Sequence, residues 1–116
     1  LLRMNIAIHQ NNSKLVKDDY EFIAQKYKHY NYDVREVLYT TMLLQSQGWE
    51  AAEAGFHRIR GENPYTRNLR YKIICAKLKD SKVPFHEKKK LETEQRQLET
   101  KKMFDPFHQF QCFDFQ

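Results

Sequence analysis

Glycine and proline are scarce in this 116-residue chain, which contains three of each. These residues end helices and form the tight turns of β-structures, so their scarcity favours long helices over many short strands. Long hydrophobic runs are also missing, because the longest, at 42–44 and 73–76, fall far short of the roughly 18 residues that cross a bilayer. We therefore predict an all-α fold with no membrane-spanning helix.

Only two cysteines are present, Cys75 and Cys112. They are too few and too far apart to indicate a disulfide framework, and no Cys-x-x-Cys pair suggests a zinc site. Two separate thiols are typical of proteins from a reducing compartment.

Sequence motifs for catalysis and metal binding are missing as well. No two histidines have the i, i+4 spacing of a helical metal site; they occupy positions 9, 29, 57, 86 and 108. The glycines stand singly, and no Gly-Lys-Ser/Thr phosphate loop follows any of them. We therefore expect a protein that is not an enzyme by itself and that has no catalytic residues, metal or cofactor.

Basic residues, in contrast, are abundant and are concentrated in the segment 57–90. This segment holds eleven Lys and Arg against three acidic residues, a net charge of +8, whereas the whole chain carries +5. A local excess of this size predicts an anionic partner, which could be phosphates, lipid head groups or an acidic protein surface.

Helix boundaries are predicted from capping residues and from hydrophobic residues spaced three and four positions apart. Acidic residues start the first two predicted helices, at Asp18 and at Asp33. A third is expected over 49–60, although Gly55 lowers its helix propensity by about 1 kcal/mol relative to alanine. Asn63 is a suitable cap for a fourth helix, which should end near residue 82.

A fifth, solvated helix is expected over 86–102, where Leu91 and Leu98 are the only strongly apolar residues. The predicted fold is a small irregular bundle of four to five helices with an extended Phe-rich tail. We expect one domain over residues 1–116. Its predicted parts are an N-terminal segment at 1–17, with a polar loop at 11–17, a helical part at 18–102 and a docking tail at 103–116.

The fourth predicted helix carries two apolar stripes on opposite sides. Tyr65, Leu69, Ile73 and Ala76 form one, and Tyr71, Ile74, Cys75 and Leu78 form the other. A surface helix of a monomer needs only one such stripe, so two predict burial on both sides. The second contact could come from other helices of the chain or from a partner protein. We predict that Arg67, Arg70 and Lys77, which lie between the stripes, contact a partner together with Tyr71.

The C-terminal segment 103–116 has a different character, because it holds five of the eight phenylalanines. Five phenylalanines left in water would promote aggregation, so this segment is expected to dock, either on its own domain or on a partner. The predicted contact residues are Phe104, Pro106, Phe107 and Phe110.

The order of several motifs resembles a known family, subunit 7 of mitochondrial ubiquinol–cytochrome c reductase (respiratory complex III). The similar stretches are Leu15-Val16-Lys17-Asp18-Asp19, Asp33-Val34-Arg35-Glu36-Val37-Leu38, the helix at 65–76 with the turn at Pro84, and Met103-Phe104-Asp105-Pro106-Phe107. They cover about a third of the chain and occur in the order of the family. The family's Arg-Arg-Leu-Pro after the second motif is missing here, and 39–63 corresponds to an insertion.

The resemblance implies an all-helical, non-catalytic accessory subunit, peripheral on the matrix side of the mitochondrial inner membrane. It would pack against cytochrome b and the core proteins, with anionic phospholipid as a further partner, and would bind no redox centre. Two alternatives stay open from the residues themselves. One is a basic RNA-binding protein of a mitochondrial ribosome, and the other is a self-contained helical adaptor.

Overall fold

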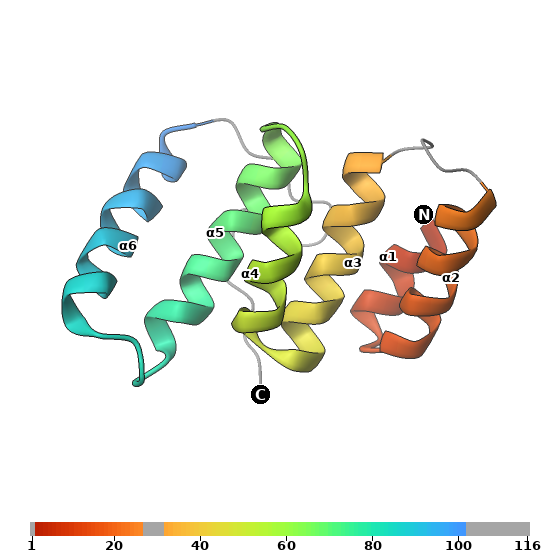
Figure 1. The fold of residues 1–116 in the computed structure, drawn as a ribbon, viewed down its shortest axis with the longest axis horizontal. Helices are drawn as coiled ribbons and strands as arrows, with labels where there is room; N and C mark the ends of the chain where they lie inside the picture. Colours follow the sequence, from red (N-terminus) through yellow and green to blue (C-terminus); the bar gives the residue numbers. More distant parts are fainter. Residues whose placement is uncertain (1, 27–31, 102–116) are drawn as a thin grey trace.

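The computed structural model describes residues 2–26 and 32–101, and helices are the only regular secondary structure in these two ranges (Figure 1). The helices are α1 (Leu2–His9), α2 (Ser13–Lys26), α3 (Tyr32–Gln47), α4 (Trp49–Arg58), α5 (Pro64–Lys79) and α6 (Phe85–Glu99). The all-α prediction is confirmed, and the described ranges hold six helices rather than four to five.

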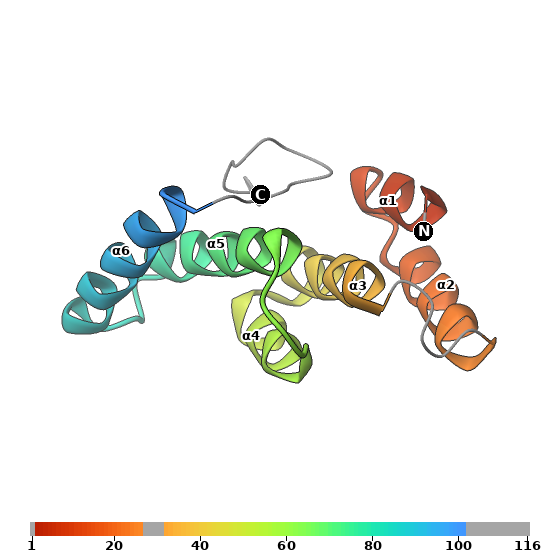
Figure 2. The ribbon, with the colours of Figure 1, turned by 90° about the horizontal axis from the view of Figure 1, so that it is seen from above.

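The helices form a row in which neighbours along the chain are mostly neighbours in space. The central helix, α3, contacts α1, α2, α4 and α5, whereas α6 contacts α5 alone among the described helices. Seen from above, α3 and α5 lie in the middle of the row with α4 beside them, and the α1–α2 pair and α6 occupy the two ends (Figure 2). Each end therefore has a face that no other described helix covers.

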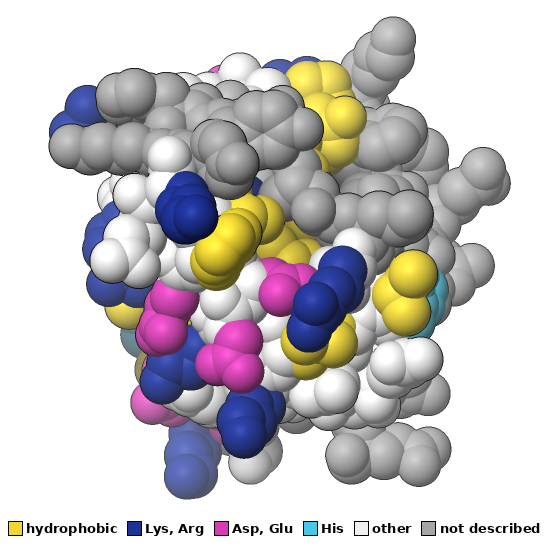
Figure 3. All heavy atoms as spheres, turned by 90° about the vertical axis from the view of Figure 1, so that its right-hand side faces the viewer, with side chains coloured by type: hydrophobic (Ala, Val, Ile, Leu, Met, Phe, Trp, Pro, Cys, Tyr) yellow, Lys and Arg dark blue, Asp and Glu magenta, His cyan; other side chains and the backbone are white. Residues whose placement is uncertain are grey.

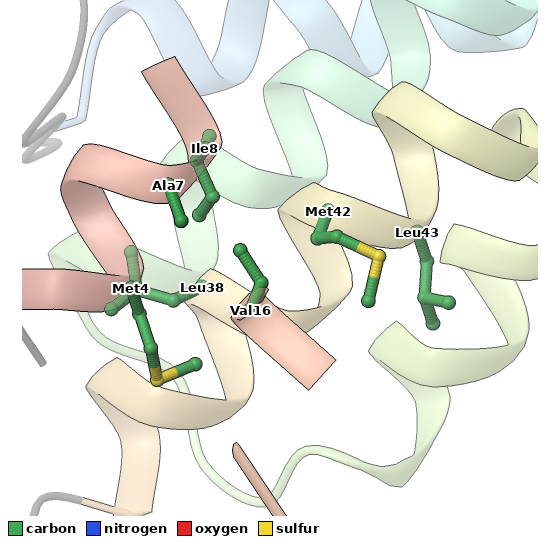
Figure 4. Close-up of a cluster of buried hydrophobic side chains, with 7 residues drawn as sticks. All are labelled: Met4, Ala7, Ile8, Val16, Leu38, Met42 and Leu43. Carbon is green, nitrogen blue, oxygen red and sulfur yellow. The ribbon is translucent and has the colours of Figure 1, made fainter. Parts of the chain in front are cut away.

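The N-terminal part differs from the prediction, because residues 2–9 and 13–17 are helical. Met4, Ala7 and Ile8 of α1 follow the i, i+3, i+4 spacing of an amphipathic helix, and each is at most 2% exposed. They pack in a cluster completed by Val16, Leu38, Met42 and Leu43 (Figure 4). The polar loop predicted at 11–17 is thus wrong for residues 13–17, which belong to α2.

The cap of α2 explains why this helix begins earlier than predicted. The backbone N–H of Leu15 donates to Oδ1 of Asn12 at 3.2 Å, which is the bond that an N-cap side chain makes. Asn11 turns the chain between α1 and α2 with a φ of 54°. The Asp18–Asp19 pair, from which the sequence predicts the start of this helix, lies inside α2 instead.

The start of α5 is as predicted. Oδ1 of Asn63 accepts hydrogen bonds from the backbone N–H groups of Tyr65 and Thr66 at 2.9 and 3.0 Å. The Thr66 hydroxyl accepts the backbone N–H of Asn63 in return, at 2.9 Å, which completes a capping box.

Both sides of α5 are buried, as its two stripes predict. Leu69 and Ile73 are 0% exposed in a cluster with apolar residues of α3 and α4. On the other side, Ile74 is 0% exposed in a cluster that includes Leu91 and Leu98 of α6. The helix predicted to be merely solvated therefore supplies the second contact, and the burial of α5 does not require another protein.

Helix α4 forms in spite of Gly55, and the contact of this glycine with α3 gives the reason. A Cβ atom at Gly55 would lie 3.2 Å from both Cγ2 and Oγ1 of Thr40, which is closer than ordinary van der Waals contact. Gly55 lowers the helix propensity of α4, but the missing side chain allows α4 to pack closely against α3.

We expect Gly55→Val to lower the free energy of unfolding by about 2 kcal/mol, because the added methyl groups overpack the α3–α4 contact. Urea denaturation followed by circular dichroism measures this. The matched control is Ala54→Val, at the exposed neighbouring position of the same helix, where we expect only a few tenths of a kcal/mol from helix propensity. Equal losses for the two variants would contradict the close contact.

Candidate binding surface

Arg70 on α5 joins three helices through its guanidinium group. Its Nε and Nη2 atoms donate to the two carboxylate oxygens of Glu94 on α6, at 2.8 and 3.0 Å. Its Nη1 donates to Oε1 of Glu53 on α4 at 3.3 Å. The hydrogen bonds with Glu94, followed by its charge, raise the pKa of Arg70 despite partial burial. This two-point pairing is the strong geometry of arginine with a carboxylate.

Lys77, two turns further along α5, binds the same carboxylate oxygen of Glu53. Its Nζ lies 3.0 Å from Glu53 Oε1 and 3.5 Å from Glu87 Oε1 of α6. The ammonium group also lies 4.9 Å from the centroid of the Trp49 ring, and the side chain is only 7% exposed. The ammonium group of Lys77 is therefore paired with carboxylates and packed against an aromatic ring, and its aliphatic chain is shielded from water.

Glu53 is the shared acceptor of these two cations. Burial alone would raise its pKa, but the hydrogen bonds and charges of Lys77 and Arg70 outweigh burial and hold the pKa below its ordinary value. We call Glu53, Arg70, Lys77, Glu87 and Glu94 the charged cluster. It ties α4 and α6 to α5 and occupies two of the three cations that the sequence predicted to contact a partner.

The third predicted cation, Arg67, lies beside a cavity of about 300 Å³ between α5, α6 and the turn before α5. Nη1 of Arg67 and Nζ of Lys101 each lie 3.6 Å from Oε1 of Glu62, a carboxylate that is 63% exposed. Such long, exposed pairs contribute little stability.

Tyr71 is 8% exposed, and its hydroxyl donates to Oε1 of Glu99 at 3.0 Å. Burial and then this hydrogen bond raise the pKa of Tyr71. Its side chain belongs to the contact between α5 and α6. The predictions for Phe104, Pro106, Phe107 and Phe110 lie outside the described residues.

The cysteines differ from the sequence interpretation, because Cys75 is disulfide-bonded. The expectation of two separate thiols is therefore wrong for Cys75. Cys112 lies outside the described residues.

A second cavity, of about 370 Å³, lies between α2, α3 and α4. The rings of Tyr20 and Tyr39 stack in its wall with centroids 4.1 Å apart, and the Tyr20 hydroxyl donates to Oε1 of Glu36 at 2.8 Å. Burial, followed by the hydrogen bond to Glu36, raises the pKa of Tyr20 to about 12. The tyrosine–glutamate pair stabilises the contact of α2 with α3.

The exposed hydrophobic side chains lie at the ends of the row. Ile6 on α1, Phe22 on α2 and Phe85 at the start of α6 are the large hydrophobic residues with high exposure among those described, at 49%, 54% and 74%. None of them lies on the middle helices α3, α4 and α5. None of the three is among the contact residues predicted from the sequence, because each is a single apolar residue within a helix and no local pattern marks it as uncovered.

Neither related proteins nor an ion site among the described residues indicates what the chain does. The chain has no match among protein-family models, curated proteins or solved structures. Within residues 2–26 and 32–101, no group of three or more His, Cys, Asp and Glu side chains is placed to hold a metal ion. No helix in these ranges has both the length and the apolar character needed to traverse a bilayer. The exposed side chains at the ends of the row and the sequence resemblance therefore remain as the indications of function.

Proposed function

We propose that this chain is a non-catalytic accessory subunit of mitochondrial respiratory complex III, the ubiquinol–cytochrome c reductase. In this proposal it lies peripherally on the matrix side of the inner membrane, packs against cytochrome b and the core proteins, and supports the assembly of the complex. The choice of this complex rests on the sequence resemblance. The role as a subunit rests on the surface of the α1–α2 end.

The observation that carries the proposal is the pair of exposed hydrophobic side chains at this end, Ile6 and Phe22. The core beneath them is already complete, since Met4, Ala7 and Val16 are 0% exposed. Within the proposal, these two side chains at the uncovered end of the helical row contact the partner protein and leave water on binding.

Charged side chains of both signs lie beside hydrophobic ones on this end of the molecule (Figure 3). Lys17 and Glu21 of α2 are exposed, and Arg3 pairs with Asp19 at 3.3 Å. A mixed polar rim around an apolar centre is the usual composition of a protein–protein interface. This composition favours a protein subunit as the partner here.

The charged cluster restricts where a partner binds. Arg70 and Lys77 already have carboxylate partners from α4 and α6, so a partner that paired with them would have to displace Glu53, Glu87 or Glu94. The proposal therefore assigns protein contact to the α1–α2 end, and contacts by Arg67 and by the tail residues stay predictions.

The resemblance treats 39–63 as an insertion relative to the family. In the structure this stretch includes α4 and half of α3, and Leu44 and Ala52 are buried against Leu69 and Ile73 of α5. Within the proposal, 39–63 is thus an integral part of the subunit rather than an added loop.

The alternative, a basic protein of a mitochondrial ribosome, is favoured by one observation, the lysines around the turn between α5 and α6. Fractionation of a detergent-solubilised mitochondrial extract separates the two functions. We expect the chain to migrate with the haem absorbance of complex III and to stay there after nuclease digestion. Loss from its particle on RNA digestion would contradict the proposal and support the ribosome.

The role of the α1–α2 end is tested in the same fractionation with the double variant Ile6→Ser, Phe22→Ser. We expect the fraction of the chain that migrates with complex III to fall about tenfold or more, as for the loss of two central interface residues. The matched control is Phe85→Ser at the opposite end, which should leave this migration unchanged. Equal effects of the two variants would contradict the assignment of the interface to α1 and α2.

A further inference from the structure

The turn that joins α5 to α6 lies at the lower left of the ribbon (Figure 1), and lysines precede and follow it in the sequence. Residues 79–90 contain five lysines and two acidic residues, a net charge of +3. The lysines are Lys79, Lys82, Lys88, Lys89 and Lys90, of which all but the half-buried Lys88 are exposed. We call this segment, together with Phe85, the basic tip.

The two acidic residues of the basic tip bind groups that belong to the fold. Asp80 accepts the Trp49 Nε1–H at 2.8 Å and the backbone N–H of Lys82 at 2.9 Å. Glu87 lies 3.5 Å from Nζ of Lys77, as a member of the charged cluster. Among the described residues, none of the five lysines forms an ion pair with a carboxylate. Their charge is thus available to an external anion.

Phe85 lies between Lys82 and Lys88 in the sequence and is 74% exposed. Val83, two residues earlier, is 7% exposed within the α5–α6 cluster, and its backbone N–H donates to the Asp80 carbonyl at 3.3 Å. The turn is therefore anchored on both sides of residues 81–82. Since Nζ of Lys89 lies 5.2 Å from the centroid of the Phe85 ring, the apolar ring and this cation share one surface.

We propose that the basic tip binds anionic phospholipid at a membrane surface, with the lysines at the phosphate groups and the Phe85 ring at the boundary of the acyl chains. Clustered lysines are attracted to anionic lipid, and an aromatic ring placed among them gains by leaving water. RNA phosphates would satisfy the lysines, but a single phenylalanine offers no series of rings for successive bases. A protruding turn also fits a flat surface.

This inference goes beyond the proposed function, because it concerns an activity of the isolated chain whichever assembly contains it. It also narrows the anionic partner predicted for the segment 57–90 to its last twelve residues, 79–90. Arg67 and Arg70 lie nearer the start of α5, whereas the basic tip begins at Lys79, the last residue of that helix, and continues into α6.

The test uses the full chain and co-sedimentation with vesicles of phosphatidylcholine and phosphatidylserine in a roughly three to one ratio, with pure phosphatidylcholine vesicles as reference. We expect binding to the anionic vesicles only. The triple variant Lys82→Gln, Lys89→Gln, Lys90→Gln should lower the partition coefficient about a hundredfold, since each lysine near an anionic surface contributes about fivefold.

The control for this charge change is the triple variant Lys14→Gln, Lys17→Gln, Lys26→Gln on α2, which removes three exposed lysines at the opposite end. We expect it to change the partition coefficient less than about threefold, because charges further away than the Debye length are screened. Equal losses for the two triple variants would overturn the proposal, as would a wild-type chain that does not bind the anionic vesicles.

The aromatic part is tested by Phe85→Ser, which we expect to lower the partition coefficient about tenfold. The matched control is Phe22→Ser, whose ring is 54% exposed and has Nζ of Lys26 at 5.4 Å from its centroid. It should bind vesicles as the wild type does. Preference for single-stranded RNA over the vesicles, or equal binding by both serine variants, would overturn the proposal without affecting the assignment of the α1–α2 end.

Discussion

Replacing Ile74 by alanine is expected to lower the free energy of unfolding of the isolated chain by about 3–4 kcal/mol. Ile74 is 0% exposed and packs with Val83, Leu91 and Leu98, which come from the turn after α5 and from α6. The variant loses the transfer free energy of three buried carbon atoms and leaves a cavity that the surrounding helices only partly fill. Urea denaturation of the purified chain measures the loss.

The control is Ile6→Ala, an identical substitution at a side chain that is 49% exposed, for which we expect less than about 0.5 kcal/mol. The comparison also decides which protein covers the second stripe of α5. If an outside partner covered that stripe, Ile74→Ala would cost the isolated chain no more than Ile6→Ala does. Such a result would contradict the packing of α6 described above.

The parts of the fold that the sequence predicts well are those with a strong local signal. The two stripes of α5 follow directly from residue spacing, and each stripe lies in its own cluster of the structure. Asn63 is followed by Pro64 and Thr66, so the start of α5 could be located from the sequence alone.

The sequence predicts α6 as a solvated helix, although α6 packs against α5, because the apolar stripe of α6 is narrow. Leu91 and Leu98 are seven residues apart, and a charged sequence separates them. Two leucines suffice because α6 contacts only α5 among the described helices, so a single line of contact has to be covered. In a row of helices an end member needs less apolar surface than a middle one.

The charged cluster could not be predicted from the sequence for a different reason. Glu53 and Glu94 lie 17 and 24 positions away from Arg70, on two other helices. No local spacing rule relates residues at such separations, because their proximity depends on how the helices pack. A partly buried guanidinium needs an anion, and the structure supplies the anion for Arg70 from within the chain.

The same dependence on packing makes Glu53 the most sensitive charge of the cluster. We expect Glu53→Gln to lower the free energy of unfolding by about 1–3 kcal/mol at neutral pH, because Lys77 and Arg70 both lose a charged acceptor in a partly buried site. The folded-state pKa of Glu53 lies below its ordinary value of 4.5. Its stabilising effect is therefore complete above pH 4.5 and is lost as the pH falls through the folded-state pKa.

The difference between wild type and Glu53→Gln should consequently be largest near pH 7 and shrink as the pH falls below 4.5, which urea titrations at a series of pH values measure. The control is Glu50→Gln on the same helix, at an exposed position in its first turn, where we expect a few tenths of a kcal/mol from the helix dipole. A loss for Glu53→Gln that stayed constant down to acid pH would show that glutamine disturbs packing rather than charge. In that case Lys77 and Arg70 would depend on Glu87 and Glu94 instead, and α4 would be held to α5 by apolar contacts alone.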